Sequence, residues 1–459
     1  MAAFDRALSR VRQDCPELDP DRINQLARQQ EHTFRNTTLT PGKTLTLFAR
    51  QVAQGNIACA SVRHLADKKF TDSAWCQARS RLPIELIEQV QRSMVQTARR
   101  ELDQTDDAGD GAYRWRGHRV YVVDGTGDSM PDTPQLREHY GVPGECKEGL
   151  GFPTSHLLLL MDQRSGLFID CVDNPLGTSD LSQAQSMYRH MEAGDVLLGD
   201  HGFSGWGHFA LILQAGLNVV LPPNKRRIIS FRRSRTHVKP QGGGSKKRNG
   251  KPRSKVIEVL DKDDQLVELF KPRDTDKPAW MSQGVWDQLP PSIVVREIRR
   301  TVKRKGFRPL VVTVVTTLLD AEAYPADDVV ELRLTRWMIE TNLRHLKTTL
   351  KMDQLKCKTV DGVRKERLMF LLVYNLIRLI MLRASRQQRV NVNRLSFADT
   401  LAWLRYGELT VCVELKVNPN REGRLEPRVI KRRKRHFPHM RRPRRQLKAQ
   451  LRARHGDTT

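Results

Sequence analysis

The stretch RVYVVDGT, residues 119–126, is a short run of apolar and β-branched residues that ends in an acid followed by Gly and Thr. Similar runs follow along the chain: HLLLLMD at 156–162, GLFIDCV at 166–172, DVLLGD at 195–200 and LNVVLPP at 217–223. Short runs that are apolar throughout predict strands buried on both faces of a sheet. Helical segments separate the last three runs, and this alternation predicts an α/β domain.

Residues 1–112 precede this domain and carry apolar residues at helical spacing, which predicts a helical N-terminal domain. Within it, residues 60–83 fit a helix, a turn and a second helix, with Thr71 as the N-cap. Arg79 and Arg81 then lie in the last turn of the second helix. This helix pair could contact DNA or could be an ordinary part of a helical bundle, and periodicity favours neither.

Residues 225–308 interrupt the α/β pattern. Residues 239–255 are a run rich in Gly, Lys and Arg that predicts a loop, and residues 255–272 predict a hairpin. We therefore expect a β-rich insertion that divides the α/β domain into residues 113–224 and 309–390.

Two long helical stretches are expected in the second part, from about residue 326 to 352 and from about 363 to 386. The second contains the longest apolar stretch of the chain, Leu368–Leu382. It is too short for a membrane span, and Asn375 and Arg378 make it too polar. It is therefore expected to be a core helix.

The chain of 459 residues has a formal net charge of +27 at pH 7. For so basic a surface, nucleic acid is the first candidate partner, a membrane surface the second, and a solvated surface without a partner the plain alternative. The C-terminal region, 391–459, ends in a basic tail, because residues 421–455 hold fifteen Lys and Arg against two Glu. Such a tail is expected to contact phosphates without sequence specificity.

The seven cysteines are odd in number and form no CxxC pair, which argues against a disulfide framework and a structural zinc site. A reducing cytoplasm fits this pattern. The N-terminal sequence MAAFDRALSRVRQDC has no apolar segment of the kind a signal peptide needs. We therefore expect a cytoplasmic protein.

Two acids stand at the ends of expected strands. Asp124 closes VYVVD and Asp200 closes DVLLGD, and sites in open α/β sheets lie at the carboxyl ends of strands. Taken alone, either Asp is more often a turn residue or an N-cap than a site residue. A third acid, Glu340, lies in the helical stretch 331–355.

On a helix, Glu340 shares an arc of roughly 60° with Arg333, Arg336 and Lys347, beside an apolar stripe. This arrangement allows the helix to pack on a sheet while Glu340 stays at its rim. The simpler interpretation is an intrahelical salt bridge, because Arg336 and Glu340 are four residues apart.

Phosphodiester hydrolysis gives three such acids a common purpose. Two hard cations about 4 Å apart can activate an attacking oxygen and stabilise a leaving oxygen. Mg²⁺ prefers carboxylate oxygens, water and substrate phosphate as ligands. Nearby Arg and Lys side chains would bind the phosphates of a polyanionic substrate.

These residues resemble the motifs of the DDE transposases of the IS-four type. The first acid of that family lies in an Asp-Gly-Thr context, as Asp124 does, and the second in Gly-Asp-Arg-Gly-Phe/Tyr, which GDHGF around Asp200 resembles. The third lies in Tyr-x2-Arg-x3-Glu-x6-Lys, where Arg336, Glu340 and Lys347 match at the required spacing. The resemblance covers about residues 61–386, including the β-rich insertion.

The sequence departs from the family pattern at two positions. Arg333 stands where the signature has Tyr, and His201 stands where an Arg follows the second acid. In relatives, the residues at these positions help to hold the DNA end. The two departures therefore affect how the cleaved end is handled. Trp280 and Trp286, in the insertion, fit stacking on a flipped base, although tryptophans in such a segment more often belong to the core.

The resemblance implies an RNase H-like catalytic core and a cut-and-paste reaction on double-stranded DNA, at the terminal inverted repeats of an insertion sequence and in target DNA. Asp124, Asp200 and Glu340 would hold two Mg²⁺ ions, for which Mn²⁺ could substitute, while Arg336 and Lys347 would bind phosphates. It also implies a homodimer in the DNA synapse, in the bacterial cytoplasm with the nucleoid and without a membrane partner.

Three other functions stay open. The chain could be a two-metal nuclease without strand transfer, which would use the same acids. It could be a catalytically dead DNA-binding relic of a transposase, or a basic structural binder of nucleic acid. The presence of all three acids argues against the last two.

Overall fold

The computed structural model describes residues 18–66, 68–105, 114–144, 150–233, 254–303, 308–406, 415, 417 and 442–455. Three sequence features lie partly outside the described residues. They are the polar segment at 101–117, the Gly/Lys/Arg-rich loop at 239–255 and the basic tail at 421–455.

A nine-stranded sheet runs through the described part of the chain, in the order β3-β2-β1-β4-β5-β9-β8-β7-β6. Its strands are β1 (Val120–Ser129), β2 (Thr154–Asp162), β3 (Phe168–Pro175), β4 (Val196–Leu198), β5 (Asn218–Leu221), β6 (Ser254–Asp261), β7 (Asp264–Phe270), β8 (Ser292–Val302) and β9 (Leu310–Thr316). The chain is therefore a mixed α/β protein, as the sequence predicts.

The strand pairing divides this sheet into two halves. β1, β2 and β3 are antiparallel neighbours, and β4 and β5 run parallel to β1. β9 joins β5 in the antiparallel direction and continues into β8, β7 and β6. The strands predicted as an insertion thus extend the same sheet instead of forming one of their own.

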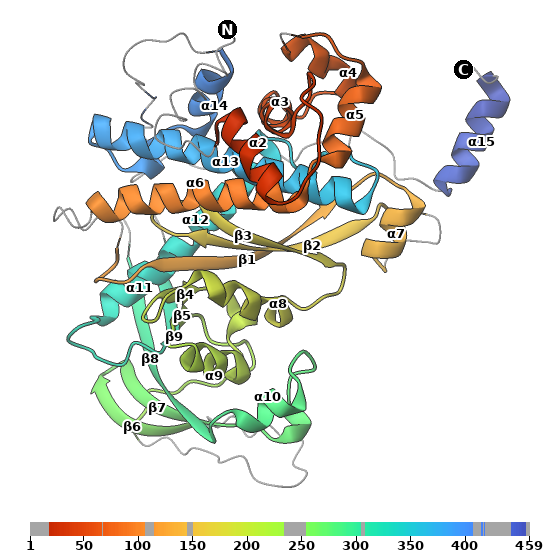
Figure 1. The fold of residues 1–459 in the computed structure, drawn as a ribbon. Coiled ribbons are helices and arrows are strands. Elements are labelled where there is room, and N and C mark those ends of the chain that lie inside the picture. The colour runs from red at the N-terminus through yellow and green to blue at the C-terminus, as the bar shows by residue number, and fades with distance from the viewer. Residues whose placement is uncertain are drawn as a thin grey trace.

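Helices cover both faces of the first half (Figure 1). α6 (Ile84–Thr105) and α13 (Val360–Gln388) lie side by side on one face, while α8 (Asp180–Met187) and α9 (Trp206–Gln214) lie on the other and contact β2 and β5. By length and composition α13 is the one described helix that could cross a membrane, but 89% of its most apolar window is buried inside the protein. This burial is what a core helix requires.

The N-terminal helices pack over α13 (Figure 1). They are α2 (Pro20–Gln29), α3 (Pro41–Ala53), α4 (Cys59–Val62), α5 (Asp72–Arg81) and α6. The expected N-cap is present, because the Thr71 hydroxyl accepts a hydrogen bond of 3.1 Å from the Ala74 N–H. The remaining helices are α7 (Pro134–Tyr140), α10 (Gln283–Gln288), α14 (Phe397–Tyr406) and α15 (Arg444–His455).

The helical stretch expected at 326–352 is not one regular helix. α11 (Ala326–Leu334) gives way to a 3₁₀ turn at Thr335–Trp337, then to α12 (Met338–Arg344) and a π-helical turn at His345–Thr349. The Thr335 hydroxyl donates to the Leu332 carbonyl at 2.7 Å, which accompanies the first change. Such irregular turns change the direction of the residues that follow, and a regular heptad or 3.6-residue pattern does not reveal them.

A buried ion-pair network fixes β1 to α13. The Arg367 guanidinium bonds both oxygens of Asp128 on β1, at 2.9 and 2.8 Å, and one oxygen of Asp173 on β3, at 2.5 Å. Asp128 lies four residues after Asp124 on the same strand. Because removing one partner of a buried ion pair is strongly destabilising, this network holds the strand that carries the first acid.

Candidate active site

Asp124 lies on β1, after four buried residues that anchor the strand in the sheet. Its Oδ1 accepts a hydrogen bond of 3.1 Å from the Gly125 N–H, and its Oδ2 lies 3.2 Å from the guanidinium of Arg336. The strand fixes the backbone, and these contacts fix the carboxylate.

Asp200 lies just beyond β4, which is parallel to β1 and directly beside it. It caps the 3₁₀ turn His201–Phe203, in which its Oδ1 accepts from the Gly202 N–H at 2.7 Å. A Cβ on Gly202 would come within 2.9 Å of that oxygen, so a larger residue there would displace the Asp200 carboxylate. His201 is half-exposed, with its Nδ1 3.7 Å from Asp200 Oδ2.

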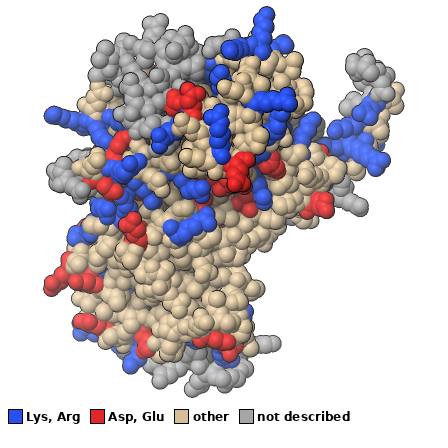
Figure 2. All heavy atoms as spheres, viewed as in Figure 1, with Lys and Arg blue, Asp and Glu red and all other residues tan. Residues whose placement is uncertain are grey.

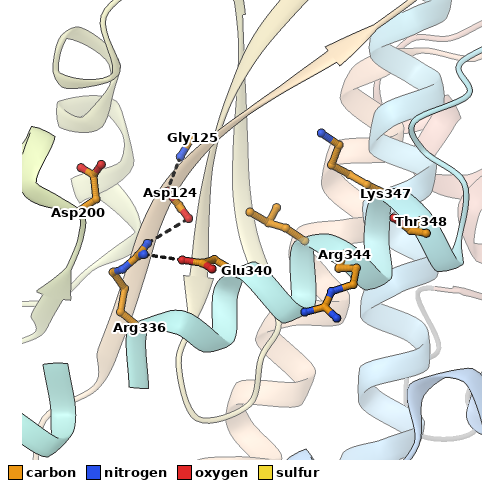
Figure 3. A pocket seen from close by; sticks show the side chains of 9 residues that line it. Asp124, Gly125, Asp200, Arg336, Glu340, Arg344, Lys347 and Thr348 are labelled. Carbon is orange, nitrogen blue, oxygen red and sulfur yellow. Dashed lines mark hydrogen bonds and ion pairs between the residues drawn. The ribbon is translucent and has the colours of Figure 1, made fainter. Parts of the chain in front are cut away.

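Glu340 lies on α12, across from both aspartates. Its Oε1 accepts a hydrogen bond of 2.6 Å from Arg336, the intrahelical contact that its spacing predicts. The same guanidinium bonds Asp124, so Arg336 bridges an acid of the sheet and an acid of the helix (Figure 3). The intrahelical salt bridge is therefore also part of the site that brings the acids together.

The three acids line one pocket with a volume of about 430 Å³. Figure 3 shows β1 and the segment of Asp200 on one side and α12 on the other. The complete lining is Asp124, Gly125, Asp200, Arg336, Glu340, Leu343, Arg344, Lys347 and Thr348. Segments more than two hundred residues apart in the sequence thus meet beside the end of β4. The prediction that a strand ends at Asp124 is wrong, because β1 continues to Ser129 through polar residues that pair with β2. Asp124 instead lies just beyond Val120–Val122, the part of β1 that pairs with β4.

The surroundings of Asp124 in the pocket disfavour its ionised form. Burial raises the pKa of Asp124 above its ordinary value, and the negative charges of Asp200 and Glu340 add to this, while Arg336 acts in the opposite direction. A carboxyl group with a raised pKa among other acids favours an additional cation nearby.

Lys347 reaches the pocket from the π-helical turn. Its ammonium donates to the Thr126 hydroxyl at 3.1 Å and to the Gly127 carbonyl at 2.6 Å, so it ties the end of the helical segment to β1. Arg344 and Thr348 line the same pocket and were not singled out in the sequence. Their spacing of four and eight residues after Glu340 places them on its face of the helix and could have identified them.

Arg333 lines a neighbouring pocket of about 300 Å³, together with Arg336 and the exposed Trp337. Burial, and then the charge of Arg336, lowers the pKa of Arg333 to about 10. Its Nε is buried without a hydrogen-bond partner in the described part of the chain. The residue at the signature tyrosine position therefore lies beside the acids but not in their pocket.

The prediction that Arg79 contacts DNA is wrong for this structure, because its side chain is buried. The guanidinium lies 3.9 Å from the centre of the Phe48 ring and bonds Gln51, Cys59 and Cys357. It therefore joins α5 to the segment that precedes α13. Arg81, two residues later, is exposed, as a phosphate contact would require.

The two tryptophans of the insertion differ in their surroundings. Trp286 is fully buried, its indole N–H donates to Asp274 at 2.8 Å, and its ring packs edge-on against Trp206. It belongs to the core, as tryptophans in such a segment more often do, and its burial in this conformation does not fit stacking on a flipped base. Trp280 is half-buried and packs against the core.

The donor set fits a hard divalent cation, because three carboxylates line one pocket whose first acid has a raised pKa. As the side chains stand, no three His, Cys, Asp or Glu residues in the described part of the chain are close enough together to hold a metal ion. Arg336 supplies the positive charge between Asp124 and Glu340 in this state.

The chain is similar in sequence to known proteins. Residues 115–376 match the family described as "Transposase DDE domain". The chain is 24% identical over 386 residues to transposase InsG for insertion sequence element IS4 of Escherichia coli strain K12, covering 80% of this chain and 78% of InsG. Putative transposase InsZ of the same strain is 29% identical over 147 residues, which cover 32% of this chain and 47% of InsZ.

Among solved structures, the piggyBac transposase synaptic complex with hairpin DNA aligns with 84% of this chain and 79% of that chain, at 10% identity and a TM-score of 0.39.

Proposed function

Because this chain belongs to the DDE transposases, with relatives among transposases of IS4-type elements, we propose that it cuts DNA at the ends of an insertion sequence and joins those ends to target DNA. DNA transposition in general follows from the family. The observation that supports the specific reaction is the meeting of Asp124, Asp200 and Glu340 in one pocket with Arg336, Arg344 and Lys347.

In the proposed reaction, water attacks a phosphorus at the element end, and the bond to the 3′-oxygen breaks to leave a 3′-hydroxyl. That hydroxyl then attacks a phosphorus of the target strand, and the bond from that phosphorus to the target's own 3′-oxygen breaks. Divalent cations, for which we propose two Mg²⁺ ions replaceable by Mn²⁺, would supply activation of the attacking oxygen and stabilisation of the leaving one. Asp124, Asp200 and Glu340 would hold them.

The basic residues of the pocket would bind and orient the DNA strand. We propose that Arg336 exchanges its contacts with Asp124 and Glu340 for a substrate phosphate, a partner that a guanidinium can bind in a bidentate manner. Lys347 would hold a phosphate near β1. Arg344, exposed at the pocket rim, extends this set.

The wider assignments are proposals that rest on the same family membership. The order β3-β2-β1-β4-β5, an antiparallel meander followed by two parallel strands, supports an RNase H-like core. Clusters of Lys and Arg over the N-terminal helices in Figure 2 support contact of that region with DNA. We further propose a homodimer on paired DNA ends and a location with the bacterial nucleoid.

The test is a cleavage and joining assay on linear DNA that carries the ends flanking this gene, with Mg²⁺ or with EDTA. Wild type and Asp124→Ala are compared. Metal-dependent nicking at the ends together with joined products, both lost in the variant, is the expected result. Metal-dependent cutting without end preference or joining would establish a nuclease instead, and binding without cutting under any metal would establish a DNA-binding relic.

A further inference from the structure

α9 contacts the turn that follows Asp200. Nδ1 of His208, on the first turn of this helix, lies 2.8 Å from the carbonyl oxygen of Phe203, the last residue of the turn. Because a carbonyl oxygen can only accept, Nδ1 carries the proton and donates it. The next residue, Ser204, donates its hydroxyl to the Pro222 carbonyl just beyond β5.

The His208 ring is buried and uncharged where it makes this contact. The ring is 1% exposed, and burial lowers its pKa to about 4, so the imidazole is neutral at neutral pH. Within the described residues, its Nε2 has no hydrogen-bond partner, and neither has the hydroxyl of Tyr188, whose ring lies 6.1 Å away. A buried nitrogen without a partner is unfavourable. The hydrogen bond from Nδ1 to Phe203 is therefore the favourable polar contact that the ring makes here.

The opposite side of α9 rests on the insertion. A Cβ on Gly207 would come within 3.0 Å of the Met281 side chain and 3.6 Å of the Trp286 ring, so the helix and the insertion meet without spare room. Trp206 packs edge-on against Trp286 at 5.7 Å and donates its indole N–H to the Leu269 carbonyl on β7 at 3.1 Å. α9 therefore connects the insertion to the turn of Asp200.

We infer that His208 is a positioning residue for Asp200, and that the insertion supports the acid through α9. Within the turn, the Asp200 carboxylate is oriented by the Gly202 N–H, one residue before Phe203. A change in the Phe203 carbonyl rotates the peptide units on which that N–H depends. Loss of the His208 contact is thus expected to disorder the carboxylate without removing it. This inference rests on the proposed function, in which Asp200 is a cation ligand.

The test compares two amide variants of the same buried position. His208→Asn places an N–H close to the original Nδ1, while His208→Gln places its N–H further out, near the original Nε2. Tyr188→Phe removes a neighbouring hydroxyl that has no partner in the described part of the chain, and serves as the control. Ile212→Ala, one turn along α9 and fully buried, is the control for a general loss of stability.

Two quantities are measured on the full chain bound to its DNA ends. The first is Mn²⁺ binding, followed by the electron paramagnetic resonance signal of free Mn²⁺, and the second is the Mn²⁺ concentration for half-maximal cleavage. For His208→Gln we expect Mn²⁺ affinity to fall about tenfold or more, as when residues that orient metal ligands are lost, with DNA affinity kept. His208→Asn should recover most of this loss, and Tyr188→Phe and Ile212→Ala should not show it.

Unchanged Mn²⁺ affinity in His208→Gln would overturn the inference, and so would an equal loss in Ile212→Ala. Asp200→Ala provides the reference. If Asp200→Ala binds Mn²⁺ and cuts like wild type, the proposed function itself has failed. If Asp200→Ala loses both and His208→Gln loses neither, only the inference about His208 has failed.

Discussion

At the scale of single residues, the acids and the arginine between them define the site. Asp124 and Asp200 each accept a hydrogen bond from a backbone N–H one or two residues further along the chain, and Glu340 is held through Arg336. Each acid can be tested by its own substitution, and Asp124 and Glu340 share Arg336 as a neighbour.

Replacing Glu340 by Gln keeps the shape of the side chain but removes its charge. We expect cleavage to fall at least about a hundredfold, since a group that supports charge development is lost, while DNA binding persists. A gel-based cleavage assay at saturating DNA measures the first and a titration with labelled ends the second. Glu331→Gln, at an exposed position of α11, should cut normally. Normal cutting by Glu340→Gln would remove Glu340 from the site.

Replacing Asp124 by Asn should stabilise the fold at neutral pH. Because the pKa of Asp124 is raised in the folded protein, its ionised form is less favourable there than in the unfolded chain, and this cost appears as the pH rises through the folded-state pKa. The variant should therefore melt at a higher temperature near pH 7, and the difference should shrink as the pH falls below the ordinary carboxyl range.

Thermal unfolding at several pH values measures this difference. Asp128→Asn, on the same strand but paired with Arg367, is the matched control and should melt lower than wild type. A lower melting temperature for Asp124→Asn at neutral pH would show that its contact with Arg336 outweighs the unfavourable surroundings of the carboxylate.

At the scale of helices and strands, local patterns predicted the elements that carry the acids, but not all of their details. A strand ending just before Asp200 follows from an apolar run that closes with an acid, and the helix of Glu340 follows from its amphipathic spacing. β1, in contrast, continues past Asp124 to Ser129, because its polar residues pair with β2. The irregular turns between α11 and the end of the Glu340 segment have no such signal. They depend on tertiary contacts, such as the stacking of His345 on Phe397, with ring centres 4.6 Å apart.

Local sequence patterns also did not predict which individual side chains are buried. Arg79 bonds Cys357, which lies 278 positions further along the chain, and Trp286 faces Trp206 across the contact between the insertion and α9. The partner of each side chain lies too far along the sequence to fall within a local window. Both side chains are of types that also bind nucleic acid, so residue type left a surface role open for each of them.

The insertion should lose much of its stability when Trp286 is replaced by Ala. Truncation of a fully buried tryptophan costs about 3–5 kcal/mol, and this ring also supports Trp206 and Gly207 of α9. Chemical unfolding measures the loss. Trp280→Ala is the matched control, and its cost should be smaller because Trp280 is only half-buried. Similar small losses for both variants would mean that Trp286 is not the core residue that this packing indicates.

At the scale of the whole molecule, positive charge is unevenly distributed. In the view of Figure 2, Lys and Arg gather over the N-terminal helices and α15, while the insertion region shows fewer of them. α15 is joined to the body through Arg444, which bonds Asp132 and the Gly151 carbonyl and lies over the Phe152 ring. In the proposed function the acids supply the chemistry, and these distributed charges are expected to supply most of the affinity for DNA.

Removal of residues 421–459 should therefore weaken DNA binding in a salt-dependent manner and leave the site intact. Each phosphate contact contributes about 0.9 to the slope of log affinity against log salt concentration. With fifteen Lys and Arg in residues 421–455, loss of even about four contacts should lower that slope by about 3.6. Because the acids and Arg336 remain, the cleavage rate of fully bound DNA should stay near that of wild type.

Fluorescence titrations at several salt concentrations measure the slope, and single-turnover cleavage at saturating protein measures the rate. The full-length variant with Arg445, Lys448 and Arg452 changed to Gln keeps the Arg444 contact and tests the charges of α15 alone. It should show a smaller drop in slope in the same direction. An unchanged slope after truncation would place the affinity elsewhere, and the exposed cations of the N-terminal helices would then be the residues to neutralise next.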